Sequence, residues 1–141
     1  MDIDRRDLAK KAIEAMEYSY SPYSNFTVGV ALLGKSGKVY SGCNVENAAY
    51  SPTNCGERTA FFKAVSEGET EFKGIAIAGK SRDQKEIQDF CSPCGVCRQV
   101  MAEFCSPEEF KIILVKNEQE LQEYLLKDLL PLGFTKDQIS I

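Results

Sequence analysis

Two cysteine motifs constrain this chain more than any other feature of its sequence. Cys55-Gly56-Glu57 lies near the middle and Pro93-Cys94-Gly95-Val96-Cys97 follows it, whereas none of the 141 residues is histidine. Without an imidazole, a metal site must use sulfur or oxygen ligands, and a catalytic base must be a carboxylate. Three thiolates with a carboxylate beside them favour a zinc site that keeps one position for water. The sequence therefore predicts a water-activating zinc enzyme.

Length, charge and cysteine usage limit the classes of protein to consider. The length suits one domain, so we expect a single domain over residues 1–141. The formal net charge of −4 gives no basic footprint for a nucleic acid, and a small neutral ligand fits better. The start lacks the apolar run of a signal peptide, and no stretch approaches the ~18 apolar residues of a membrane span. We therefore expect a cytoplasmic protein whose six cysteines serve a metal or catalysis rather than disulfides.

Hydrophobic periodicity predicts alternating helices and strands. The predicted elements are a helix over residues 4–20, strands over 26–32 and 38–43, a helix from 55 to about 67, a strand over 72–79, a helix over 94–105, and strands over 110–115 and 121–125. A polar loop over 44–54 and a charged, exposed connection over 80–89 separate some of them. This order predicts a three-layer α/β/α sandwich with a mixed five-stranded sheet. Right-handed connections would bring the two cysteine-bearing helix starts to the same end of the sheet.

The predicted positions of the cysteines favour metal binding. Cys55 opens one helix and Cys94 and Cys97 open another, where unpaired N–H groups and the positive end of the helix dipole favour thiolates. Three thiolates on Zn²⁺ leave a net charge of −1. We hypothesise that Arg58 offsets this charge through hydrogen bonds to sulfur.

The cysteine spacing is also compatible with other uses. A lone C-x-x-C can be redox-active or half of a structural zinc site. Cys91, Cys94 and Cys97 also form C-x-x-C-x-x-C, the beginning of a ferredoxin-type cluster sequence, but the next cysteine, Cys105, follows after seven residues instead of three. C-x-E combined with P-C-x-x-C is more specific than either half. Cys43, Cys91 and Cys105 are predicted to be bystander thiols.

The two motifs together match the signature of the zinc nucleobase deaminases, in its three-cysteine form. Beyond that signature, the chain resembles the small cytidine deaminases that act on free nucleosides. The resemblance covers nearly the whole length and is carried by the segments 20–24, 44–50, 55–60, 93–100 and 129–131. The connection over residues 80–89 is the least similar part.

The resemblance implies one Zn²⁺ per subunit, held by Cys55, Cys94 and Cys97, with Glu57 as the proton shuttle. The implied reaction is hydrolytic deamination of cytidine and 2′-deoxycytidine to uridine and 2′-deoxyuridine, with release of ammonia. Zinc-bound hydroxide would attack C4 of the pyrimidine. The implied role is pyrimidine salvage.

The resemblance also implies how substrate is held and how chains assemble. Asn44 and Glu46 would bind the ribose hydroxyls, with Val45 in the same substrate-binding segment. Phe26 would pack on the pyrimidine, and the Gly56 N–H would donate to its carbonyl oxygen. The family further implies a homotetramer in which neighbouring subunits complete each pocket. The matching positions for that contribution are Ala48, Tyr50 and Phe134.

Two other functions stay open from the sequence. One is a related deaminase acting on a modified nucleoside, against which Asn44-Val45-Glu46 argues because these residues suit an unmodified ribose. The other is a zinc-stabilised binding module without catalysis, in which Glu57 would fill the fourth position or face solvent. Nucleotide and polynucleotide substrates are disfavoured by the acidic charge.

Overall fold

A mixed five-stranded sheet forms the centre of the protein, as predicted. The computed structural model describes residues 3–139. The strands are β1 (Phe26–Gly34), β2 (Val39–Cys43), β3 (Phe72–Ser81), β4 (Lys111–Val115) and β5 (Leu121–Leu125), in the order β2-β1-β3-β4-β5. Only β3 and β4 run parallel among these neighbours, and the other pairs are antiparallel.

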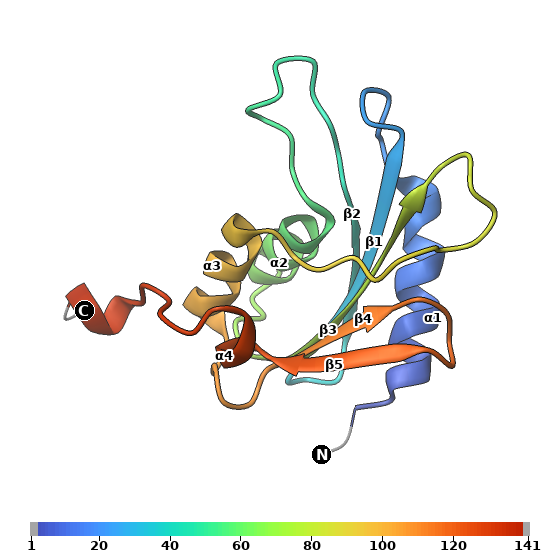
Figure 1. Ribbon diagram of the computed structural model, residues 1–141. Coiled ribbons are helices and arrows are strands. Elements are labelled where there is room, and N and C mark those ends of the chain that lie inside the picture. The colour runs from blue at the N-terminus through green and yellow to red at the C-terminus, as the bar shows by residue number, and fades with distance from the viewer. Residues whose placement is uncertain (1–2, 140–141) are drawn as a thin grey trace.

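Helices cover both faces of this sheet, which confirms the three-layer prediction (Figure 1). Helix α1 (Arg5–Ala15) lies on one face, and α2 (Gly56–Ser66) and α3 (Gly95–Phe104) lie on the other. The remaining helical segments are η1 (Met16–Tyr18), α4 (Leu126–Leu129) and η2 (Lys136–Ile139). Within residues 3–139, no helix is long and apolar enough to cross a membrane.

The two faces of the sheet are packed differently. Towards α1 the central strands present small side chains, among them Ala31 and Ala76, so that α1 lies close to the sheet. Towards α2 and α3 they present large ones such as Ile75, which pack against Phe61 and Met101 with no exposed surface. Burying each large side chain contributes about 1.5–3 kcal/mol, so this second layer holds α2 and α3 firmly in place.

The first predicted helix is shorter than expected, and this prediction was wrong at its C-terminal end. Helix α1 stops at Ala15, and Tyr20, expected on its buried face, is 55% exposed. The Tyr20 N–H instead donates to the Asn44 carbonyl at 3.0 Å, and the Tyr20 carbonyl accepts from the Glu46 N–H at 2.8 Å. The backbone around Tyr20 is extended because it pairs with a segment that is remote in sequence.

The other elements agree closely with the predictions. Both predicted cysteine-bearing helices are present, with Cys55 and Cys94 as their N-cap residues. Val96, expected on the apolar side of α3, is 58% exposed instead. The connection after β3 is exposed, as predicted, apart from the buried Ile87.

The close approach of α1 to the sheet depends on Gly29 in β1. A Cβ atom there would lie 2.5 Å from the backbone nitrogen of Met16 and closer still to the carbonyl oxygen of Ala12. Helix backbone cannot move aside as a side chain can. We expect Gly29→Ala to lower the free energy of unfolding by about 1–3 kcal/mol, measured by urea denaturation. Gly95→Ala is the control, since nothing lies within 4 Å of its Cβ position. Equal midpoints for the two variants would contradict this account.

Candidate active site

Three sulfur atoms converge where α2 and α3 begin. Cys55 and Cys94 are the N-cap residues of the two helices, and Cys97 is in the first turn of α3. Their Sγ atoms all lie within 4.8 Å of one another, and those of Cys55 and Cys94 are 3.7 Å apart. Two sulfurs bound at about 2.3 Å to a tetrahedral zinc ion lie about 3.8 Å apart. The donor set and this spacing therefore both fit zinc, and the predicted meeting of the two helix starts is confirmed.

The charges around the cluster favour thiolate ligands. The Cys97 thiol and the Arg58 guanidinium, whose Nη2 lies 3.2 Å from the Cys55 sulfur, lower the pKa of Cys55 to about 5. The Cys97 thiol donates its hydrogen to the Cys55 sulfur. This hydrogen bond, together with burial, raises the pKa of Cys97. The Nε of Arg58 is buried without a hydrogen-bond partner among the described residues. A guanidinium held in this way is suited to a site that carries negative charge, as three thiolates around Zn²⁺ would.

Glu57 places a carboxyl group beside the sulfurs. It lies in the first turn of α2, and only 4% of its surface is exposed. Burial, assisted by the negative charge at Cys55, raises the pKa of Glu57 to about 7. A carboxyl group with a pKa near neutrality can both accept and release a proton under the same conditions, as a general acid–base catalyst must.

The remaining three cysteines lie outside this cluster. Among residues 3–139, only Cys55, Cys94 and Cys97 form a group of three or more metal-ligating side chains. Burial raises the pKa of Cys43, of Cys105, and of Cys91, the last to about 11. Such thiols stay protonated at neutral pH. The structure therefore gives no support to the ferredoxin-type alternative, which needs Cys91 as a ligand.

Asn44 and Glu46 lie on the same side of the extended segment that follows β2, since they are two residues apart. Asn44 is buried: its Oδ1 accepts from the Val28 N–H at 2.9 Å, and its Nδ2 donates to the Phe26 carbonyl at 2.9 Å. The Glu46 carboxylate accepts hydrogen bonds from the Tyr23 and Ser24 segment, and the Ser24 hydroxyl lowers its pKa. Glu46 also lines an open hollow of about 410 Å³.

Phe26 and Gly56, the residues predicted to contact the pyrimidine, lie at the starts of β1 and α2. Phe26 is 40% exposed. Gly56 is buried at the first position of α2, where a backbone N–H has no partner within the helix. A Cβ at Gly56 would lie 3.3 Å from Val28, so the glycine is close-packed.

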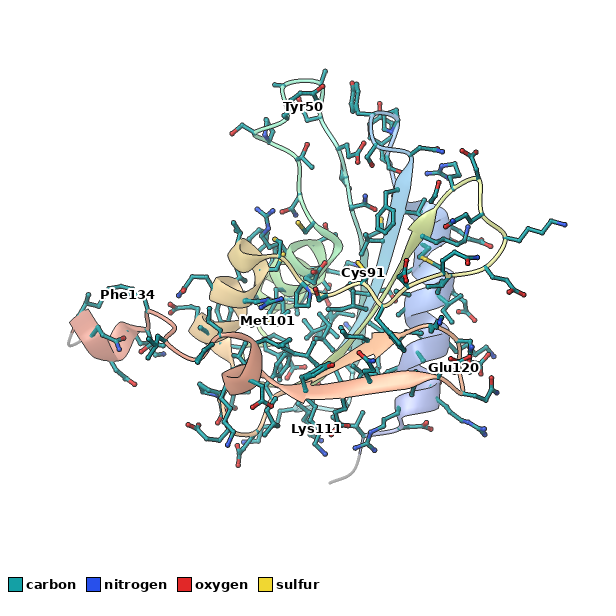
Figure 2. All side chains as sticks on the ribbon, viewed as in Figure 1. Tyr50, Cys91, Met101, Lys111, Glu120 and Phe134 are labelled. Carbon is teal, nitrogen blue, oxygen red and sulfur yellow. The ribbon has the colours of Figure 1, made fainter. Side chains whose placement is uncertain are left out.

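The other predicted substrate-binding residues are all exposed in the single chain. Tyr50, 73% exposed, is on the loop that projects beyond β2, and Phe134, 60% exposed, is on the C-terminal segment that extends from the body (Figure 2). Figure 2 shows both at the periphery, well away from Cys91. Ala48 is exposed on the same loop as Tyr50, and Val45 faces away from Asn44 and Glu46.

Sequence reasoning missed a polar network behind Asn44. The Ser19 hydroxyl donates to Asn44 Oδ1, and Ser21 and Arg82 extend the network to the connection after β3. Ser19 and Ser21 have no distinctive local pattern, and Arg82 is one of several charged residues in an exposed loop.

Comparisons with known proteins agree with this geometry. The family model described as "Cytidine and deoxycytidylate deaminase zinc-binding region" matches residues 3–113. A cytidine deaminase of Halalkalibacterium halodurans is 46% identical over 138 residues, covering 98% of this chain and 99% of the relative. A cytidine deaminase of Sporosarcina psychrophila is 44% identical over 140 residues, covering 99% and 96%.

Solved structures show the same fold. The crystal structure of cytidine deaminase from Burkholderia pseudomallei superposes with a TM-score of 0.83 at 41% identity, covering 94% of this chain and 100% of that one. The cytidine deaminase from Mycobacterium tuberculosis gives a TM-score of 0.79 at 34% identity, covering 94% and 98%. With its converging sulfurs and buried carboxyl group, this chain belongs to the cytidine and deoxycytidylate deaminase family.

Proposed function

We propose that this chain is a single-domain, zinc-dependent enzyme that converts cytidine and 2′-deoxycytidine to uridine and 2′-deoxyuridine, releasing ammonia, in pyrimidine salvage. The observation that carries the proposal is the buried Glu57 carboxyl group beside three converged cysteine sulfurs. The cytidine deaminases that resemble the chain over nearly its full length support the substrate class.

Cys55, Cys94 and Cys97 would hold one Zn²⁺ per chain as thiolates. When bound, zinc lowers the pKa of a coordinated water towards about 7 and so supplies a nucleophile at neutral pH. Arg58 donates to the Cys55 sulfur and partly offsets the charge of the thiolates. The positive charge of Arg58 would bring the net charge of the zinc and its three thiolates closer to zero, so that the bound zinc would still polarise water.

Glu57 moves the protons of the reaction. Its carboxylate receives a proton from the attacking water and delivers it to N3 of the pyrimidine, which makes C4 electrophilic. The same carboxylate then takes the remaining proton from the hydroxyl added at C4 and passes it to the amino group. The C4–N bond breaks, ammonia leaves, and the C4 oxygen becomes the carbonyl of uridine. Burial raises the pKa of this carboxyl group, which favours its taking up a proton.

The remaining residues would orient the nucleoside. The Gly56 N–H donates to the pyrimidine carbonyl oxygen, and the Phe26 ring packs against the base. Asn44 retains one free hydrogen on Nδ2, because only the other hydrogen is used, in the bond to the Phe26 carbonyl. Glu46 retains one free acceptor position on Oε2. One ribose hydroxyl, which accepts and donates, satisfies this pair.

We propose in addition a cytoplasmic homotetramer whose subunits complete one another's pockets. The supporting observation is the exposure of Tyr50 and Phe134, two large side chains on projecting segments. Ala48 shares the loop of Tyr50, and Val45 would form part of the same substrate-binding segment.

The ligand assignment predicts a selective loss of metal. Purified wild-type protein should contain one equivalent of zinc per chain by atomic emission, and Cys55→Ser should contain little. Cys91→Ser is the matched control and should retain one equivalent, since Cys91 lies outside the cluster. The assignment fails if Cys55→Ser and Cys91→Ser hold equal amounts.

The role of Glu57 predicts a catalytic defect without a binding defect. Glu57→Gln should retain zinc and fold but lose about 10²- to 10⁴-fold in kcat for cytidine, followed by ammonia release. Glu103→Gln, on the exposed surface of α3, is the control and should match wild type. A wild-type, zinc-loaded protein inert towards cytidine would instead indicate a binding module.

The shared-pocket proposal predicts complementation between subunits. Sedimentation should give four times the mass of one chain. The Tyr50→Ala and Glu57→Gln proteins should each have low activity. When the two are mixed, dissociated and reassociated, part of the activity should return, because some pockets then combine an intact Glu57 from one subunit with an intact Tyr50 from its neighbour. No recovery in mixed assemblies would argue that Tyr50 serves only its own chain.

A further inference from the structure

A chain of buried polar groups leads from the surface to Asn44. Ser19 and Ser21, in the segment between η1 and β1, are 8% and 3% exposed, and their hydroxyl oxygens lie 3.1 Å apart. The Ser19 hydroxyl also donates to Oδ1 of Asn44, which is 9% exposed. Buried hydroxyl groups in an otherwise apolar environment need partners at both ends, so this network has to be completed from outside the segment.

Arg82 completes it from the connection that follows β3. The Arg82 N–H donates to the Asn25 carbonyl at 2.8 Å, which continues the β1–β3 ladder by one residue and fixes the start of the loop. The guanidinium Nη2 then donates to the Ser19 carbonyl and to the Ser21 hydroxyl oxygen, each at 3.0 Å. A hydrogen bond from the Asn25 side chain to Asp83, at 2.8 Å, holds the loop from its other side.

The donors in this network point one way. A guanidinium only donates, so the Ser21 oxygen accepts from Arg82. Ser19 gives its single hydroxyl hydrogen to Asn44, so Ser21 must supply the hydrogen of the Ser19–Ser21 contact. The order is therefore Arg82 to Ser21 to Ser19 to Asn44 Oδ1. Aligned hydrogen bonds of this kind strengthen one another, and here the series begins at a cation.

The network fixes the orientation of the Asn44 amide. With Oδ1 taken by Ser19 and the Val28 N–H, the amide cannot rotate its oxygen towards a ligand. The free group is the second hydrogen of Nδ2, whose first hydrogen bonds the Phe26 carbonyl. Asn44 is thus held as a donor and is tied to the backbone that carries Phe26.

We propose that Arg82, acting through Ser21 and Ser19, is a positioning residue that sets Asn44 to donate to a ribose hydroxyl. This gives a role to the connection after β3, and it rests on the proposed nucleoside deaminase function. The network acts on sugar binding and not on proton transfer, because it reaches Asn44 and does not touch Glu57 or the sulfurs.

The test compares two substrates in two variants. Arg82→Met removes the donors but keeps an apolar stem, and Ser21→Ala breaks the same series without changing the charge. Each should raise KM for cytidine about tenfold, with kcat and zinc content near wild type. With 2′,3′-dideoxycytidine, which lacks the hydroxyls, the same variants should change KM by less than about twofold. Arg82→Lys should recover part of the cytidine KM.

Controls separate this proposal from others. Lys85→Met removes a positive charge from the same exposed loop and should leave both KM values unchanged. An unchanged cytidine KM in Arg82→Met and Ser21→Ala, or an equal rise for both substrates, would overturn the positioning role. If Arg82→Met does not fold, Ser21→Ala decides the question alone. Wild-type protein that fails to deaminate cytidine would instead refute the proposed function itself.

Discussion

The meeting of two helix N-termini above one face of the sheet is the constraint on which this structure depends. Helix α2 brings Cys55 and Glu57, and α3 brings Cys94 and Cys97. The two helices are held at a fixed separation, because fully buried side chains such as Phe61 and Met101 pack into the same hydrophobic core. The sulfur cluster is thus assembled by apolar packing that does not involve the sulfurs themselves.

The pKa values of two neighbouring acidic groups, the Glu57 carboxyl and the Cys55 thiol, are shifted in opposite directions. Burial raises the pKa of Glu57 to about 7, whereas hydrogen bonds from Cys97 and Arg58 lower that of Cys55 to about 5. The two pKa values differ in direction because the carboxyl group is buried in protein, whereas the sulfur accepts hydrogen bonds that stabilise its thiolate. A thiolate ligand and a protonatable carboxyl group can therefore exist side by side at neutral pH, which a hydrolytic deaminase requires.

Much of this arrangement was predictable from local sequence signals. The helix starts at Cys55 and Cys94 and the alternating strand that begins at Phe26 each leave a short-range pattern. Tyr20 did not follow its pattern, because its backbone pairs with Asn44 and Glu46, and helical spacing carries no information about such a partner. The link from Arg82 to Ser19 spans 63 residues. Hydrogen bonds over that distance depend on the completed fold, so no window of sequence could have indicated them.

The site is also divided between two independent supports. The sulfur cluster depends on the apolar layer beneath α2 and α3, whereas the proposed sugar-binding residue Asn44 is held by a polar series that ends in a surface loop. Loops tolerate changes of length and composition far better than cores do. On the proposed assignment, rebuilding this loop would alter which sugars are accepted and would leave the residues that carry the reaction unchanged.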